Sequence, residues 1–400
     1  MLSKLPTRTP AEQLKKVLGG GGSKQLYHIL PELRKDPWSW GIKVKKIGKL
    51  HERIAEDMEK YCQAHELGYD FAHLCRSSPC PCEHAGVRFR PKECEEDSRG
   101  RLKADMHLVV QRYVKPWTAP FEASYSAVIV ADTAVQKLHT KKSLSGECGA
   151  EVFISHCWNE PFCGFLGALE ASLDPEIVVW VCSLGIDQNV NIGAEIGGDL
   201  FNCPFARALK GAQRVLVLMD ESAEPLTRVW CVLEAHLAFL WGKPYDMALP
   251  PLAEGLDEMA WRTVGERLRT LDMRNCLASH ISDKQRILDL VSENTGGVDG
   301  LNSEVRSVSA RASERAEVLG AAAAGRVAVL EAAPSVLLAL ADARGRTPAH
   351  FAAERGRIEV LELLHARQAD LAALDAERRS PLSVAAEAGA AKGVELLLRL

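Results

Sequence analysis

The sequence lacks the apolar segments that mark membrane-spanning and secreted proteins. Its 400 residues contain no run of about 18 apolar residues, the length that a helix needs to cross a bilayer. Residues 1–16 also lack the apolar centre of a secretory signal peptide. We therefore expect a soluble cytoplasmic protein with no membrane span.

A strong charge of one sign is missing as well. The chain carries 49 Lys and Arg against 53 Asp and Glu, which leaves a net charge of -4 at pH 7. This balance gives no general attraction to nucleic acids, so we expect no nucleic-acid partner. The chain also contains no G-x-x-x-x-G-K-[ST] loop of the kind that cradles nucleotide phosphates.

The 12 cysteines are not arranged as a disulfide scaffold. They are scattered, and some lie within apolar runs, as Cys182 and Cys231 do, so we expect mostly reduced thiols. One group in a proline-rich loop contains zinc-binding side chains: Cys75, Cys80, Cys82 and His84. Its spacing is not that of a standard zinc motif, so no metal is predicted, and weak zinc ligands or free thiols remain the two interpretations.

The length predicts several domains, because single domains mostly contain about 100 to 200 residues. Apolar residues recur every three or four positions from Ile47 through Leu50 and Ile54 to Tyr61, which predicts a helix. We expect a helical or irregular N-terminal region over residues 1–110.

Four apolar runs of strand type follow, and the last three are separated by stretches of helix length: 126–130, 152–154, 177–181 and 215–219. This alternation predicts a parallel sheet covered by helices, within an α/β domain over residues 111–296. Ser282 and Gln285 cap the expected last helix of that domain. Residues 297–316, rich in Ser, Arg and Glu, are expected to form a polar linker or short helix before a repeat region over 317–400.

The C-terminal part repeats itself with a period of 33 residues, and this period is typical of ankyrin repeats. Three pairs of positions recur at that spacing: Asp342 and Asp375, Thr347-Pro348 and Ser380-Pro381, and Gly356 and Gly389. The first complete unit contains Asp342-x-x-Gly345-x-Thr347-Pro348-x-His350, and it closely resembles the ankyrin family. A degenerate unit near 321–330 precedes it, so we expect one degenerate and two well-formed repeats in an α-helical solenoid.

These repeat residues have structural roles in the pattern. Thr347 can cap a helix, Pro348 fits its first turn, and Gly356 can end it in a left-handed conformation. The leucines at 363–364 and 396–398 are expected to face neighbouring repeats, because a single repeat cannot bury its own apolar face. A structural role is therefore expected for His350 as well.

The α/β region resembles a Toll/interleukin-1 receptor (TIR) domain, whose first strand carries V-F-[IL]-S and whose later helix carries W-C-x-x-E. The matching segments occur in the same order here: Val152–Trp158, Val179–Cys182, Val215–Leu218 and Trp230–Glu234. The resemblance covers about 100 residues and implies a flavodoxin-like α/β fold. TIR domains commonly act by self-association, which the resemblance also implies.

A closer resemblance is to an uncharacterised group of protist proteins, often fused to ankyrin repeats. Its motifs are found here at Val114–Thr118, Ser124–Tyr125, Phe153–Trp158, Pro204–Phe205 and Arg228–Glu234. Residues 179–188 are also similar to a tryptophan-to-IDQ element of fungal heterokaryon-incompatibility domains, which are TIR-like. Neither group implies an activity.

In TIR families that cleave NAD, the glutamate of W-C-x-x-E is catalytic, and the resemblance carries that role to Glu234. A carboxylate near the ribose stabilises the positive charge that develops as nicotinamide leaves. Ser155, His156 and Trp158 follow the first strand of the domain, where open α/β sheets bind ligands, and they are expected to line the NAD pocket. The other interpretation places Glu234 on the polar face of an amphipathic helix.

The sequence therefore predicts a signalling or scaffold protein that binds a protein partner through ankyrin repeats and carries a TIR-like module. An NAD-cleaving hydrolase, with NAD as substrate and Glu234 as catalytic residue, is the alternative. No other cofactor is predicted. A thiol nucleophile at Cys157 is not expected, because neighbouring residues on a strand point to opposite faces and Cys157 cannot readily pair with His156.

Overall fold

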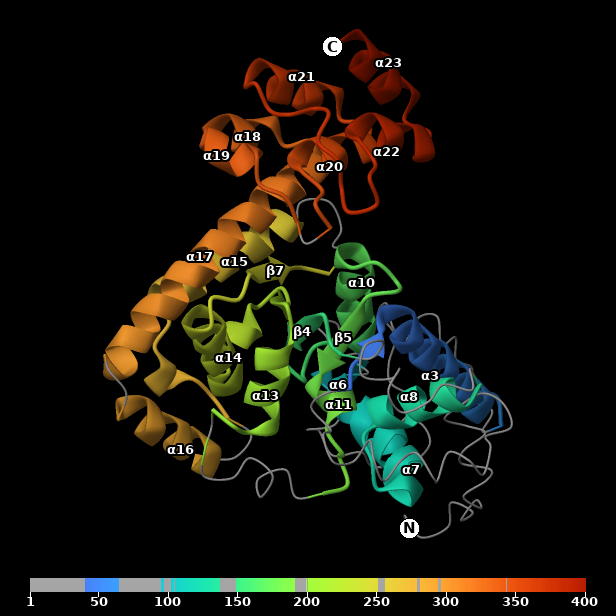
Figure 1. The fold of residues 1–400 in the computed structure, drawn as a ribbon, viewed down its shortest axis with the longest axis vertical. Coiled ribbons are helices and arrows are strands. Elements are labelled where there is room, and N and C mark those ends of the chain that lie inside the picture. Colours follow the sequence, from blue (N-terminus) through green and yellow to red (C-terminus); the bar gives the residue numbers. More distant parts are fainter. Residues whose placement is uncertain are drawn as a thin grey trace. The chain divides into compact units, whose positions relative to one another are not determined.

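The computed structural model gives two compact units (Figure 1), the first within residues 1–167 and 175–215 and the second within 168–174 and 216–400. The residues described are 40–64, 95–96, 102–103, 105–136, 149–190, 199, 201–250, 256–278, 281–293, 296–342 and 344–400. The cysteine-rich group from Cys75 to His84 lies outside these residues, so its metal assignment stays a prediction. The domain boundaries expected from the sequence also stay predictions.

Five strands form one mixed sheet in the order β1-β5-β4-β6-β7. β4 (Val152–Ser155) and β5 (Val178–Val181) run parallel, with Phe153 opposite Trp180, whereas β1 (Ile42–Lys43) runs antiparallel to β5. The expectation of a purely parallel sheet is therefore wrong, and a flavodoxin-like fold is not confirmed. β1 was missed because it is a two-residue edge strand, too short to leave an alternating or apolar pattern.

Three of the four strand predictions are confirmed, by β4, β5 and β6 (Arg214–Leu218). The fourth, at 126–130, is wrong: those residues lie in α8 (Tyr125–Gln136), whose first turn is capped where the Ser124 Oγ accepts the Ala127 N–H at 3.2 Å. Most side chains of its first two turns are buried. A helix that is apolar nearly all round gives the same short run as a buried strand, so the local pattern could not separate the two.

The first unit contains the helix expected near the N-terminus. This helix is α3 (Val44–Ala64), and Ile47, Leu50 and Ile54 are buried as their spacing predicts. The other elements are β2 (Glu95–Glu96), β3 (Leu102–Lys103), α6 (Met106–Val109), η2 (Val110–Val114), α7 (Lys115–Thr118), η3 (Ala119–Phe121), α10 (Phe162–Ser172), α11 (Cys182–Gly185) and α13 (Pro204–Gly211). The last five residues of α10, which follow Gly167, belong to the second unit with the rest of 168–174.

The second unit holds β7 (Tyr245–Ala248), which the sequence analysis did not identify, and the remaining helices. They are η4 (Glu224–Thr227), α14 (Val229–Leu240), α15 (Leu256–Thr270), η5 (Met273–Asn275), α16 (Ile281–Ser292), α17 (Gly297–Ala324), α18 (Val327–Ala332), α19 (Ser335–Leu338), α20 (Pro348–Glu354), α21 (Ile358–Ala366), α22 (Pro381–Glu387) and α23 (Ala391–Arg399). Among the described helices, none combines the length and apolar character needed to span a bilayer.

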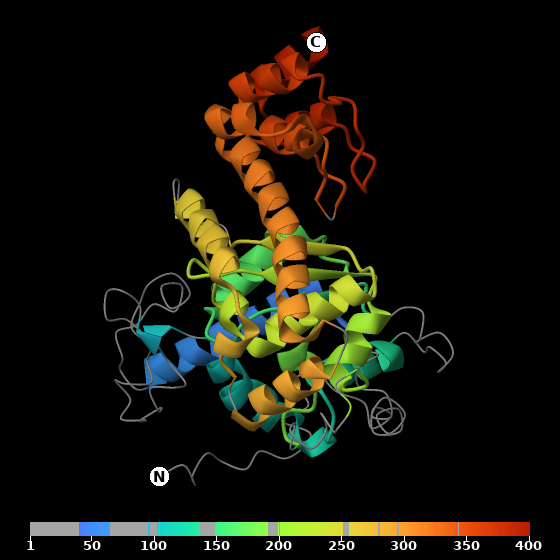
Figure 2. The same ribbon diagram turned by 90° about the vertical axis from the view of Figure 1, so that its left-hand side faces the viewer.

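α17 replaces the polar linker or short helix that was expected over 297–316. It is a single helix of 28 residues, about 42 Å long at 1.5 Å per residue, and Figure 2 shows it as one uninterrupted element. Its buried stripe recurs every three or four residues through Val298, Leu301, Val305, Ser309 and Ala312. Two of these five side chains are Ser and Ala, so the stripe is only weakly apolar. The average hydropathy of the segment is therefore that of a polar linker.

The N-terminal half of α17 is fixed by polar contacts within the second unit. The Asn302 Oδ1 accepts the Met273 N–H at 2.9 Å, and its Nδ2 donates to Asp272 at 3.0 Å. Further along, Glu304 lies 2.9 Å from His236 Nδ1 of α14, and Arg306 Nε donates to the Leu271 carbonyl at 3.0 Å. These side chains bond α17 to its neighbours at several points.

We expect Asn302→Ala to lower the free energy of unfolding by about 1–3 kcal/mol, because the buried Met273 N–H loses its acceptor. Urea unfolding of the intact chain measures this. The control is Ser303→Ala, which makes the same change to alanine at the exposed neighbouring position and should shift stability by less than about 0.5 kcal/mol. Equal shifts in the two variants would contradict the role given to Asn302.

Candidate functional site

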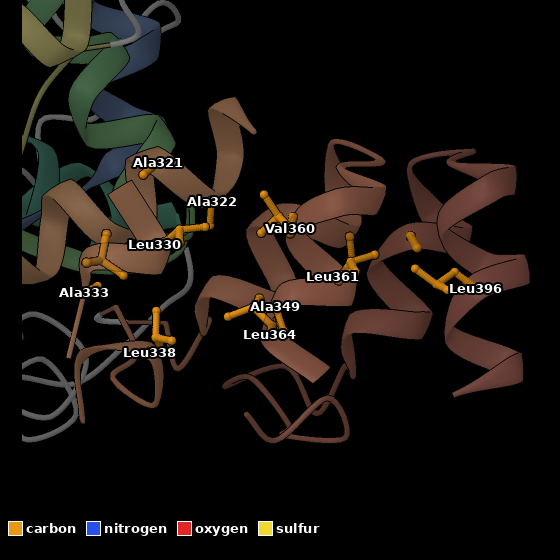
Figure 3. Close-up of a cluster of buried hydrophobic side chains, with 14 residues drawn as sticks. Ala321, Ala322, Leu330, Ala333, Leu338, Ala349, Val360, Leu361, Leu364 and Leu396 are labelled. Carbon is orange, nitrogen blue, oxygen red and sulfur yellow. The ribbon is translucent and has the colours of Figure 1, made fainter. Parts of the chain in front are cut away.

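The C-terminal helices of the second unit stack in pairs around one apolar core (Figure 3). The end of α17 pairs with α18, α20 pairs with α21, and α22 pairs with α23. The buried side chains of the cluster come from all three pairs and from the segment that follows α18: Val318, Ala321, Ala322, Leu330, Ala333, Leu338, Ala349, Ala352, Ala353, Val360, Leu361, Leu364, Ala385 and Leu396. Each pair therefore buries apolar surface that it could not bury alone.

The leucine clusters follow the stacking only in part. Leu364 and Leu396 are buried in the shared core and Leu363 and Leu397 pack against it. Leu398, which was expected to face a neighbouring repeat, is 71% exposed. Three consecutive leucines cannot direct all three side chains to one face of a helix.

The start of α20 is held by a reciprocal contact with His350. The Thr347 N–H donates to His350 Nδ1 at 3.1 Å, and the opposite ring nitrogen, Nε2, donates to the Arg379 carbonyl oxygen at 3.0 Å. Pro348 fills the first helical position, where no backbone donor is needed. His350 is buried and therefore links one repeat to the loop of the next.

Asp342 and Asp375 play equivalent parts in successive loops. The Asp342 carboxylate accepts the Arg346 N–H at 2.8 Å and its Nε at 2.9 Å. Asp375 accepts the same two donors from Arg379, at 2.8 and 2.9 Å. Burial of the Asp375 carboxylate acts to raise its pKa, but the Arg379 backbone and guanidinium donors outweigh burial, so the pKa lies below its usual value.

The two arginines were not singled out from the sequence, although a signal was present. Arg346 and Arg379 are 33 residues apart, like the aspartates that they bind. Between these loops, the Arg344 carbonyl accepts the Ala376 N–H at 2.7 Å. A side chain at Gly345, which has a φ of +74°, would place its Cβ 3.3 Å from that same Ala376 nitrogen, so the loop requires glycine.

A shallow groove of about 460 Å³ lies at the first helix pair of the array. Its apolar lining comes mainly from α18 and from Val318 and Leu337, and its only charged lining residues are Glu314 and Glu317 of α17. The two glutamates are three residues apart and therefore lie on one face of the helix. Among the described residues, neither forms an ion pair.

The residues predicted to line an NAD pocket fall in the first unit, after β4. Ser155 is the last residue of β4 and is almost fully buried. His156 and Trp158 instead meet at Cys182, the residue that follows β5: Trp158 Nε1 donates to the Cys182 Sγ at 3.3 Å, and His156 Nε2 lies 3.6 Å from the same sulfur. From the sequence Cys182 was expected only to be a reduced thiol within an apolar run, because His156 is 26 positions away in the chain and no local pattern shows their proximity.

His156 is fixed in one orientation. Its Nδ1 lies 3.0 Å from the Cys157 carbonyl oxygen, and its ring packs against Phe165 with centroids 4.9 Å apart. Burial lowers the pKa of His156 to about 4, although the bond to the Cys157 carbonyl opposes that shift and nearby His107 adds to it. The imidazole is therefore neutral at neutral pH.

Glu234 lies in the second unit, in the middle of α14, and is only 6% exposed. The interpretation that it occupies a polar, solvent-facing side of an amphipathic helix is wrong, because its neighbours from Cys231 to Ala238 are all buried. Its charge acts on Tyr245, whose pKa is raised chiefly by burial and further by Cys231 and Glu234. Glu234 is thus a buried carboxylate in an apolar helix, and its catalytic role stays a prediction.

Residues 321–400 match the family model described as ankyrin repeats in three copies. The match begins where the first unit was expected, so a total of three repeats is confirmed, whereas the division into one degenerate and two well-formed repeats stays a prediction. Ankyrin repeats are stacked modules whose surfaces bind other proteins, and protein binding is therefore supported for this part of the chain.

The rest of the chain has no such support. The ankyrin match covers a fifth of the 400 residues, and no TIR domain was matched. No curated protein matches the chain. The TIR-like module therefore remains an expectation from the sequence motifs.

We expect Asp375→Asn to destabilise the ankyrin array by about 1–3 kcal/mol at pH 7, because Arg379 loses its charged acceptor. The folded-state pKa of Asp375 is depressed, so its contribution is complete above the unfolded pKa of about 3.9 and is lost as the pH falls through the lower folded value. Thermal unfolding is measured at pH 7 and at decreasing pH. The difference in unfolding temperature between wild type and variant should disappear below about pH 4.

Glu395→Gln is the matched control for this substitution. Like Asp375 and Arg379, Glu395 and Arg399 form an ion pair four residues apart, and the substitution removes its carboxylate. Here, however, both partners are about 70% exposed. We expect a change of less than about 0.5 kcal/mol. A pH-independent difference between Asp375→Asn and wild type would contradict the role of the Asp375 charge.

Proposed function

We propose that this protein is a cytoplasmic scaffold that binds a protein partner in a signalling pathway through its ankyrin array. One observation carries the proposal: three helix pairs stack on a shared core and match the ankyrin family. A stacked array presents a continuous surface made of several repeats, and such a surface suits an extended protein contact better than a small-molecule site.

The groove at the first helix pair supports a particular kind of contact. Its floor is apolar and its charged side chains, Glu314 and Glu317, are both acidic. Leu337 lines the groove, and its neighbour in the sequence, Val336, is a further apolar side chain that is 68% exposed. A partner helix or strand with apolar side chains beside Lys or Arg would complement this combination.

We expect Glu314→Lys/Glu317→Lys to weaken partner binding at least tenfold, about 1.4 kcal/mol, because the two lysines that replace the acidic side chains of the groove repel a basic partner. The intact chain serves as bait, and the proteins it retains are quantified by mass spectrometry. Each retained protein is then titrated in purified form against both baits.

The matched control is Glu359→Lys/Glu362→Lys on α21, which makes the same charge change at two exposed glutamates with the same spacing. A partner kept by wild type and by the α21 variant but lost by the groove variant supports the proposal. Equal binding to all three chains would exclude the groove, and equal loss in both variants would show only a response to net charge.

The second proposal is that the TIR-like region cleaves NAD through Glu234. The observation in its favour is the burial of this carboxylate in an apolar helix, since glutamate is rarely buried and a buried polar side chain is the informative exception. The resemblance to TIR domains implies that activity would require self-association, so the assay uses high protein concentration.

This proposal expects nicotinamide release from NAD by wild type and none from Glu234→Gln, which keeps the shape of the side chain and removes its charge. Chromatography of the reaction mixture measures the release. The unfolding temperature of Glu234→Gln is compared with that of wild type, and equal temperatures show that the substitution leaves the fold intact. No release from either chain would leave the scaffold as the sole proposal.

A further inference from the structure

Cys182, His156 and Trp158 form a side-chain cluster that protein binding by the ankyrin array does not use. β4 and β5 are parallel neighbours, so the residues that follow them come together at one edge of the sheet. His156 and Trp158 follow β4, and Cys182 follows β5. Cys182 is placed as a nucleophile beside His156 as a base, and the Cys157 carbonyl oxygen orients that base.

The unprotonated ring nitrogen of His156 faces the Cys182 sulfur. The Cys157 carbonyl oxygen can only accept a hydrogen bond, so the His156 nitrogen that lies 3.0 Å from it, Nδ1, carries the ring proton. Nε2 then holds the lone pair, and it lies 3.6 Å from the Cys182 Sγ, within the reach of a sulfur donor. The neutral imidazole can take the thiol proton as the sulfur reacts.

A second donor favours negative charge on the sulfur. Trp158 Nε1 donates to the Cys182 Sγ at 3.3 Å, and the backbone of Trp158 is held where its carbonyl accepts the Met106 N–H at 3.0 Å. The Cys182 backbone is fixed too, because its carbonyl accepts the Gln188 Nε2 at 3.0 Å. A hydrogen bond to the charged form of a group favours that form, so Trp158 stabilises a thiolate as it develops.

We propose that Cys182 is a nucleophilic thiol, with His156 as its base, and that it is oxidised by small hydroperoxides to a sulfenic acid. Cys182 is half-buried and its base, His156, is buried, so we expect only a small reagent to reach the sulfur. Thiolate character together with partial exposure is the combination that makes a cysteine susceptible to this reaction.

The reaction balances with hydrogen peroxide as the only co-reactant. The Cys182 sulfur attacks one peroxide oxygen, a sulfur–oxygen bond forms, and the oxygen–oxygen bond breaks. His156 Nε2 takes the thiol proton and passes it to the departing hydroxide, which leaves as water. The sulfur loses two electrons, which the peroxide gains, and the product is the sulfenic acid of Cys182.

The test exposes the intact chain to hydrogen peroxide at pH 7 with dimedone as the sulfenic-acid trap, and peptide mass spectrometry gives the rate at each cysteine. The same measurement on the urea-unfolded chain provides the rate of Cys182 without its neighbours. Burial alone would make the folded chain react more slowly. We instead expect Cys182 to react about tenfold faster when folded, while half-buried Cys163 of α10 reacts more slowly when folded.

His156→Gln removes the base and keeps a polar side chain of similar size, and it should abolish the acceleration at Cys182 without changing the rate at Cys163. Trp158→Phe keeps an aromatic ring but removes the N–H donor, and it should reduce the acceleration. Slower reaction of Cys182 in the folded wild-type chain than in the unfolded chain would overturn the proposal, whatever the stability of the variants. So would an unchanged rate in His156→Gln.

Discussion

The packing of α17 is the constraint on which the second unit depends, because this one helix has two sets of neighbours. It packs on α14, α15 and β7, and its C-terminal end is the first helix of the ankyrin array. An array of three repeats is near the smallest that is stable, so the core that α17 contributes to the first repeat matters for the others. Helix α17 thereby links stability in the two parts of the unit.

Within the array, apolar stacking and polar loop contacts depend on one another. The helices approach closely because alanines such as Ala352 and Ala353 lie between them. That approach brings the loops together, so that His350 reaches the Arg379 carbonyl and the Arg344 carbonyl reaches the next loop. The rigid spacing keeps the groove beside Glu314 and Glu317 in a fixed shape, which a protein partner needs.

The cluster at Cys182 follows from a different constraint, the parallel pairing of two strands. Parallel strands end at the same edge of a sheet, and the loops that leave them must meet there. Two segments that are 26 residues apart in the chain thus place an imidazole and an indole around one thiol. The thiol and the ankyrin groove belong to separate units, so their chemistry can be tested independently.

The sequence by itself determined the ankyrin repeats, three of the strands and the helix at 44–64, because each has a periodic or apolar pattern that local residues carry. It could not determine that 125–136 is a helix, since a segment buried on all sides shows no period. It also missed α17, whose buried stripe includes Ser309 and Ala312. Only the tertiary structure decided that β1 is antiparallel, that Glu234 is buried and that His156 faces Cys182, because pairing and burial depend on residues far away in the chain.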